Sequence, residues 1–227
     1  MIFAINVDIM RCQCYYSSEL VVYEMKKIIF LIALFIVYSM TVNLCPAVAQ
    51  ADINIIKSMQ SVFHNIPSFV LLLPDCELYA ALIILPLIIG GIYFFRNYLL
   101  IDIVLFSSSP LAAYLLNIIV KNTVRRPRPL DELQLFVHPS TYSFVSSHTL
   151  VTTTLWGLVI FYVSEYCRNK LLKISVIIFS VLWIIFVGFS RILSGVHNPT
   201  DVLGGYLLGV ILVYIYVKLI RLIGGKC

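Results

Sequence analysis

Long, uninterrupted apolar runs dominate the pattern of this chain. They lack the spacing of an amphipathic helix and the alternation of a half-buried strand. Several approach the roughly 20 residues that a helix needs to cross about 30 Å of hydrocarbon. The pattern predicts membrane-spanning helices over residues 28–44, 78–95, 99–120, 149–163, 172–189 and 202–220.

Composition supports a membrane protein. Hydrophobic residues make up 61% of the 227 positions and charged residues 12%, with a mean hydropathy of +0.98. Soluble domains contain roughly 45–50% apolar residues. We therefore expect an all-α, polytopic membrane protein with six transmembrane helices in one bundle. Residues 25–227 form its single domain, and residues 1–24, which are mixed in character, form an N-terminal extension.

The stretch that begins at Met25 also resembles a secretory signal. It has two lysines, an apolar core and the sequence AVAQ at 47–50, which fits a cleavage pattern. Cleavage would leave five crossings. Retention is favoured, because an even number of crossings returns the C-terminal lysines to the lysine-rich side.

Most basic residues flank helix ends that six crossings place on one side of the membrane. They are Lys26, Lys27, Arg96, Arg168, Lys170, Lys173, Lys218, Arg221 and Lys226. Since cytoplasmic loops retain Lys and Arg, both termini are predicted to be cytoplasmic. The signal-like start favours a bacterial cytoplasmic (inner) membrane.

Six basic residues fall on the opposite, outer side, and five of them occur in two short clusters. The six are Lys57, Lys121, Arg125, Arg126, Arg128 and Arg191. The first cluster is KNTVRRPRP at 121–129, where two prolines prevent a continued helix. Cations held so close together favour a dense anion, and the forked donors of arginine suit phosphate oxygens. The alternative is a basic patch that binds anionic headgroups.

The second polar stretch is YSFVSSHTL at 142–150, at the start of the fourth predicted helix. Ser146 and Ser147 are good helix caps, and a helix N-terminus favours bound phosphate. His148 lies beside this anion pocket. A catalytic and a purely structural role both remain open for it.

The third stretch is SRILSGVHNPTD at 190–201. Asn198 suits the N-cap and Pro199 the first helical position, which places Asp201 at the third. A carboxylate there can reach back over the cap, toward His197. It would fix the tautomer of that imidazole and leave the other ring nitrogen free to attack. Capping alone is the alternative, and the two roles are compatible.

Together the three stretches supply two histidines, a carboxylate and at least three cations on one face of the membrane. Phosphoryl transfer through a phosphohistidine needs these groups: a nucleophile, a proton donor and positive charge around the phosphate oxygens.

The same stretches resemble the signatures of the type 2 phosphatidic acid phosphatase superfamily. K-x6-R-P matches Lys121, Arg128 and Pro129; P-S-G-H is similar to VSSH at 145–148; and S-R-x5-H-x3-D matches Ser190, Arg191, His197 and Asp201. The resemblance covers roughly the last 130 residues. It implies a metal-independent enzyme without a cofactor, with His197 as nucleophile, Asp201 as its orienter and His148 as proton donor. The phosphate would be held by Lys121, Arg128, Ser146 and Arg191, with the backbone N–H of Ser147.

Two positions depart from the family pattern: Val145 stands for proline and Ser147 for glycine. Because glycine lets a backbone approach a ligand closely, Ser147 predicts a loosened or retuned pocket. Arg125 and Arg126 lie between the motif anchors, where headgroup binding and a plain surface role are both open.

The function expected is hydrolysis of a phosphomonoester or diphosphate of a lipid at the outer (periplasmic) face. Candidate substrates are undecaprenyl diphosphate, phosphatidylglycerol phosphate, phosphatidic acid and lipid A. The partners are then this lipid substrate and the surrounding membrane lipids, and no nucleic acid. The alternatives are a lipid phosphotransferase that uses the same phosphohistidine and a non-enzymatic anionic-lipid binder or transporter.

The segment 51–77 should contribute to headgroup selection. Its sequence INIIKSMQSVFHNI is apolar at helical spacing, which predicts a helix along the membrane interface, with His64 in a structural role. Cys45 and Cys76 both fall on the outer side, where a disulfide and two ordinary apolar cysteines are the alternatives.

Overall fold

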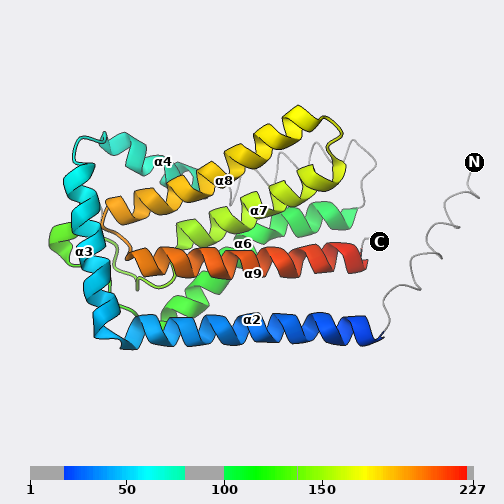
Figure 1. Cartoon of the computed structure of the whole chain (residues 1–227), viewed down its shortest axis with the longest axis horizontal. Coiled ribbons are helices and arrows are strands. Elements are labelled where there is room, and N and C mark those ends of the chain that lie inside the picture. The colour runs from blue at the N-terminus through cyan, green and yellow to red at the C-terminus, as the bar shows by residue number, and fades with distance from the viewer. Residues whose placement is uncertain (1–17, 80–99, 137, 224–227) are drawn as a thin grey trace, which may run out of the picture.

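All the regular structure in the described residues is helical (Figure 1). The structure is a computed structural model that describes residues 18–79, 100–136 and 138–223. Its elements are the α-helices α2 (Ser18–Leu44), α3 (Pro46–Val62), α4 (Ser68–Tyr79), α6 (Leu100–Val124), α7 (Ser147–Tyr166), α8 (Lys170–Leu193) and α9 (Pro199–Ile223), with one 3-10 turn, η2 (Asp131–Leu133).

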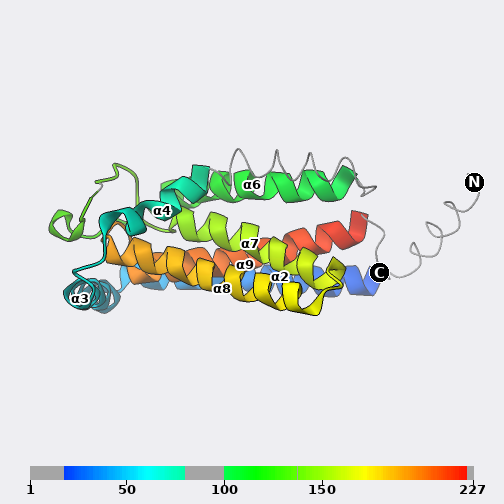
Figure 2. The same ribbon diagram turned by 90° about the horizontal axis from the view of Figure 1, so that it is seen from above.

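The five long helices α2, α6, α7, α8 and α9 run along one axis and form the bundle (Figures 1 and 2). Helix α7 packs against α6, α8 and α9. Four candidate membrane spans lie in the described residues, at Val22–Leu44, Val104–Val124, Lys170–Leu193 and Pro199–Leu222. The prediction of an all-helical membrane protein is therefore confirmed.

The predicted count of six crossings is not reproduced by these four spans. The crossing expected at 78–95 lies almost entirely outside the described residues. Helix α7, expected to cross at 149–163, is present but is not among the four. Its first half buries Thr149, Thr152, Thr153 and Thr154. A helix surrounded by other helices does not need the apolar surface that lipid demands.

The observed helices extend beyond the predicted spans, because hydropathy marks the lipid-facing middle of a helix and not its polar ends. The run predicted at 99–120 continues to Val124 in α6. Helix α2 begins at Ser18, ten residues before the predicted span and inside the predicted extension. There Glu24 accepts a hydrogen bond from Lys218 Nζ of α9 at 2.7 Å.

Glycines allow α9 to pack closely on α7. A Cβ added at Gly205 would lie 2.0 Å from Thr149 Oγ1, and one at Gly209 would lie 2.6 Å from Thr153 Cβ. The spacing is that of the G-x-x-x-G pattern, in which missing side chains let two helix backbones approach. This contact sets the distance between the N-terminal ends of the two helices.

Helices α3 and α4 close one end of the bundle. Helix α3 lies across that end, steeply inclined to α2, and α4 turns back toward α8 and α7 (Figure 1). The sequence predicted a helix for this segment, and α3 buries Ile56 while exposing most of its other side chains. Cys45 and Cys76 are both free, so the disulfide alternative is not realised.

Candidate active site

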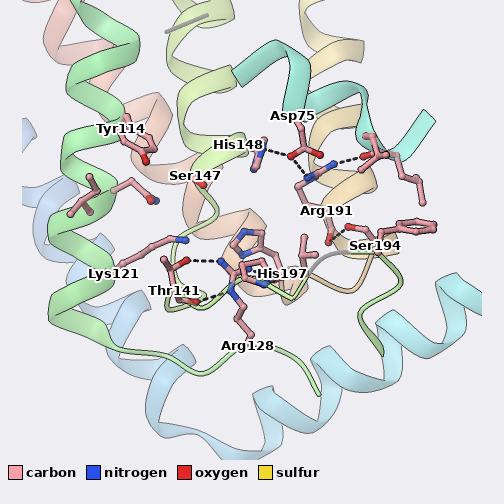
Figure 3. Close-up of a pocket in the computed structure, with 17 residues that line it drawn as sticks. Asp75, Tyr114, Lys121, Arg128, Thr141, Ser147, His148, Arg191, Ser194 and His197 are labelled. Carbon is pink, nitrogen blue, oxygen red and sulfur yellow. Dashed lines mark hydrogen bonds and ion pairs between the residues drawn. The ribbon is translucent and has the colours of Figure 1, made fainter. Parts of the chain in front are cut away.

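A cavity of about 280 Å³ lies at the end of the bundle that α3 and α4 close. Six residues singled out in the sequence line it together: Lys121, Arg128, Ser147, His148, Arg191 and His197 (Figure 3). They come from three separate stretches of the chain, and the fold brings them to one place. Ser146 and Asp201 lie behind the lining.

His197 is buried in the turn between α8 and α9, with 2% of its surface exposed. Burial lowers the pKa of this imidazole to about 3, and the charges of Arg128 and Lys121 act in the same direction. The ring is therefore neutral at pH 7. A neutral ring nitrogen beside cations is the form that can attack an electrophile.

Asp201 lies at the start of α9 and is fully buried. Its Oδ2 accepts a hydrogen bond from the Asn198 N–H at 2.8 Å, as expected for a reach back over the cap. The distance from Oδ2 to His197 Nδ1 is 3.9 Å, which is an ion-pair distance and too long for a hydrogen bond. Asp201 thus caps its helix and faces the histidine without bonding to it directly.

Arg126 is the main counterion of Asp201. Its Nη1 donates to Asp201 Oδ1 at 2.5 Å and its Nη2 donates to Asp52 Oδ2 of α3 at 2.8 Å. Ser143 Oγ donates a further hydrogen bond to Asp201. Burial opposes the charge of Arg126, but the two carboxylates raise its pKa above the ordinary value.

The expectation of a headgroup-binding or plain surface role is therefore wrong for Arg126, which is buried. Its neighbour Arg125 is exposed, and its Nε donates to the nearby carbonyl of Asn122 at 2.9 Å. Asp52 was not identified from the sequence. The available signal was an acidic residue at the start of the segment 51–77, and its partner lies 74 residues away.

Lys121 and Arg128 supply positive charge on one side of the cavity. Lys121, in the last turn of α6, is 8% exposed, and no carboxylate of the described residues pairs with it. Arg128 is anchored by donating from Nη1 to the Val196 carbonyl at 2.6 Å and from Nε to the Thr141 carbonyl at 2.7 Å. Burial lowers the pKa of Arg128 to about 10, so it remains charged at neutral pH.

Ser146 and Ser147 form the N-terminus of α7. Ser147 is the first helical residue and lines the cavity, and the first-turn N–H groups of a helix have no intrahelical acceptor. Ser146 is the N-cap, but its Oγ is buried and does not bond to the helix. Among the described non-glycine residues only Arg125 has a positive φ. Ser147 therefore sits without backbone strain where the family pattern has glycine.

Asp75, from α4, is a cavity residue that the sequence did not reveal. Its Oδ1 lies 2.9 Å from His148 Nε2 and 2.9 Å from Arg191 Nη1 (Figure 3). Burial opposes ionisation of Asp75, but the contacts with His148 and Arg191 lower its pKa below the ordinary value. Arg191 also donates from Nη2 to the Leu71 carbonyl. In the sequence Asp75 is one of two acidic residues, with Glu77, in an apolar stretch that matches no motif.

Comparison with known proteins places the chain in a family. The model of the PAP2 superfamily matches residues 102–223. Phosphatidylglycerophosphatase B of Bacillus subtilis (strain 168) is 32% identical over 143 residues, which are 60% of this chain and 67% of that protein.

Two solved structures have a similar fold. The transmembrane PAP2-type phosphatidylglycerolphosphate phosphatase from Bacillus subtilis has a TM-score of 0.72 and 27% identity, with 87% of this chain and 97% of that chain covered. LpxE from Aquifex aeolicus has a TM-score of 0.52 and 23% identity over 71% of this chain and 93% of that one, which supports the fold alone. Sequence, fold and cavity agree, and the chain belongs to the PAP2 superfamily, with the fold of its membrane phosphatases.

Proposed function

We propose that this protein is a metal-independent lipid phosphatase that hydrolyses a phosphomonoester or diphosphate of a membrane lipid through a phosphohistidine at His197. The observation that carries the proposal is the neutral, buried imidazole of His197 in the same cavity as three cations, Lys121, Arg128 and Arg191. A nucleophile and positive charge for the phosphate oxygens are thus in one place.

The residues support two half-reactions. In the first, Nε2 of His197 attacks phosphorus, the bond from phosphorus to the lipid oxygen breaks, and His148 gives its proton to the departing oxygen. In the second, His148 takes a proton from water, the water oxygen bonds to phosphorus, and the bond to His197 breaks to release phosphate. Asp201, at 3.9 Å from Nδ1, stabilises the positive charge that develops on His197.

A lipid phosphate suits the mixed lining of the cavity. Beside the cations the wall includes the apolar side chains of Leu71, Leu72, Ile118 and Phe136. A cavity of about 280 Å³ has room for a phosphorylated headgroup, while the acyl chains lie outside against the helices. The name of the similar phosphatidylglycerophosphatase B makes phosphatidylglycerol phosphate the first substrate to test.

The proposed location is the bacterial cytoplasmic membrane, with the cavity facing the periplasm and both termini facing the cytoplasm. The two ends of the bundle differ in the use of basic residues. Lys27, Arg168, Lys173 and Arg221 lie near the end opposite the cavity, where Arg221 pairs with Glu165 at 3.2 Å. These four basic residues do not line the cavity, and they lie at the end expected to be cytoplasmic.

The test is phosphate release by the purified protein in detergent with EDTA, across phosphatidylglycerol phosphate, phosphatidic acid, undecaprenyl diphosphate and lipid A. We expect release to survive chelation, and the preferred lipid to identify the substrate class. His197→Ala should lower kcat by at least about 10³-fold, since loss of a nucleophile removes the covalent path.

His64→Ala is the matched control, because His64 is exposed, does not line the cavity, and places its Nδ1 3.1 Å from the carbonyl of Ser61 nearby. It should retain wild-type turnover. Activity that disappears with EDTA would contradict metal independence, and a His197→Ala variant with normal turnover would contradict the phosphohistidine. Transfer of phosphate to an added acceptor lipid in place of water would identify a phosphotransferase.

A further inference from the structure

The carboxylate of Asp75 stands between two groups that the proposed mechanism uses, His148 and Arg191 (Figure 3). It comes from α4, outside the three motif stretches and outside the residues 102–223 that match the family model. A negative charge in a cavity for an anionic substrate requires a specific explanation, because it weakens substrate binding unless it serves another step.

We propose that Asp75 is a positioning residue that holds His148 as the proton donor to the leaving lipid alcohol. The cavity then contains two histidine–carboxylate pairs, His197 with Asp201 for attack and His148 with Asp75 for proton transfer. This inference rests on the proposed function and adds a residue to that same site.

The charges around His148 support this assignment. Three ionisable groups face its ring: Asp75 from α4, Arg191 from α8 and Lys121 from α6. Two of them are cations, which together with burial disfavour the imidazolium that a proton donor must be. Among the described residues Asp75 is the one carboxylate that acts in the opposite direction. Burial is the largest effect and leaves the pKa of His148 below its ordinary value even with Asp75 present, so without this carboxylate the proton would be held still more weakly.

The geometry also fits a fixed pair. The guanidinium of Arg191 binds α4 at two residues one helical turn apart. It donates one hydrogen bond to the Leu71 carbonyl and another to Asp75 Oδ1. This fork fixes the carboxylate oxygen that faces His148 Nε2 at 2.9 Å. The contact is an ion pair and not an aligned hydrogen bond, and the other ring nitrogen, Nδ1, has no hydrogen-bond partner in the described part of the chain. Nε2 of His148 thus pairs with the Asp75 carboxylate, while Nδ1 makes no hydrogen bond to the described residues.

Asp75 gives up no proton in this scheme. When the bond from phosphorus to the lipid oxygen breaks, the proton moves from His148 to that oxygen, and Asp75 remains an anion. When water attacks the phosphohistidine, the proton returns to His148 and restores the ion pair. Asp75 therefore matters most for a leaving group that cannot depart without a proton.

The experiment compares two substrates whose leaving groups differ in this need: phosphatidic acid, which releases an alcohol, and p-nitrophenyl phosphate, which releases a stable phenolate. The quantity measured is kcat/KM against pH, because it reports formation of the phosphohistidine. We expect Asp75→Asn to lower kcat/KM for phosphatidic acid by about 10²-fold, the usual size of general acid catalysis, and for p-nitrophenyl phosphate by less than about tenfold. The basic limb of the phosphatidic acid profile should move to lower pH.

Asp131→Asn is the matched control, an identical substitution at a side chain that is 88% exposed on η2. This variant should leave kcat/KM and its pH dependence unchanged for both substrates. Asp75→Glu, which keeps the charge, should restore the basic limb toward the wild-type position, a rescue that a purely structural role would not produce.

Equal losses on both substrates with an unmoved pH profile would overturn the proposal, since they would mean that Asp75 only holds α4 in place. A lower KM and faster turnover in Asp75→Asn would also overturn it, by showing that the carboxylate blocks the cavity. Failure of the proposed function is a separate result: the wild-type protein would then release no phosphate from any lipid.

Discussion

The buried carboxylate of Asp201 is stabilised by the hydrogen bonds that it accepts from neighbouring residues. It receives hydrogen bonds from Arg126, Ser143 and Asn198, and Arg126 carries the compensating charge. Removing one member of a buried ion pair leaves the other charge uncompensated, which costs about 3–5 kcal/mol. The stability of the protein is therefore tied to contacts that lie directly behind the cavity.

Arg126→Gln should lower the free energy of unfolding by about 3 kcal/mol or more, because Asp52 and Asp201 then lose their counterion. Arg125→Gln is the matched control in the adjacent residue, whose side chain is exposed, and should change stability by less than about 0.5 kcal/mol. Thermal or denaturant unfolding in detergent measures both. Equal shifts for the two variants would contradict the buried bridge.

The neutral state of His197 predicts how stability depends on pH. Its pKa is about 3 in the folded protein and about 6.5 in the unfolded chain. Between these values the unfolded chain binds a proton that the folded protein does not, so stability falls as pH drops below 6.5. The slope from this residue approaches about 1.4 kcal/mol per pH unit.

His197→Asn removes this titration. Melting temperatures between pH 7.5 and pH 4.5 should therefore fall more steeply in the wild type than in the variant. Parallel curves for the two proteins would show that the pKa of His197 is the same in the folded protein and in the unfolded chain, which would contradict its neutral buried state.

At the scale of elements, the packing of α9 on α7 decides the shape of the site. Helix α7 begins with Ser147 and His148, and α9 carries Asp201 in its first turn. Gly205 and Gly209 set the separation of these helices, since side chains at those positions would meet Thr149 and Thr153. A change in this contact reaches the cavity without altering any residue that lines it.

Gly209→Val should destabilise the protein by about 1–3 kcal/mol through overpacking and should also lower kcat. The next residue, Val210, is 60% exposed on α9, so Val210→Ala is the control and should be close to neutral in both measurements. Intrinsic fluorescence during thermal unfolding and phosphate release provide the two readouts. An unchanged melting temperature for Gly209→Val would show that α7 and α9 can separate at little cost.

At the scale of the whole molecule, the bundle has two chemically different ends. The cavity and η2 lie at one end, and the turn between α7 and α8 lies at the other (Figure 1). The proposed orientation places η2 in the periplasm and Cys167, which follows α7, near the cytoplasm.

A thiol reagent that cannot cross membranes tests this orientation. In a background without other cysteines, Glu132→Cys on η2 should be labelled in intact cells. A variant that keeps Cys167 as its single cysteine should be labelled only after the membrane is opened. The reverse pattern would place the cavity in the cytoplasm.

Local signals in the sequence were enough to determine the helices in the described bundle and the three polar stretches. Apolar runs, the prolines of KNTVRRPRP and the contact of Asp201 with the Asn198 N–H at the start of α9 act within a few neighbouring positions, so their effects can be read without the fold. The resemblance in these stretches also determined the family, which the comparisons confirm.

The tertiary structure decided which distant residues complete the site. Asp75 reaches His148 and Arg191, and Asp52 reaches Arg126, because α3 and α4 fold back over one end of the bundle. Apolar helices are compatible with many packings, so hydropathy could not predict which carboxylate would meet which cation. Ser147 is a second case. The motif suggested a need for glycine, but the φ angle at this position depends on where α7 begins, and it is not positive. An ion pair between helices depends on positions in space, which the spacing of residues along the chain does not determine.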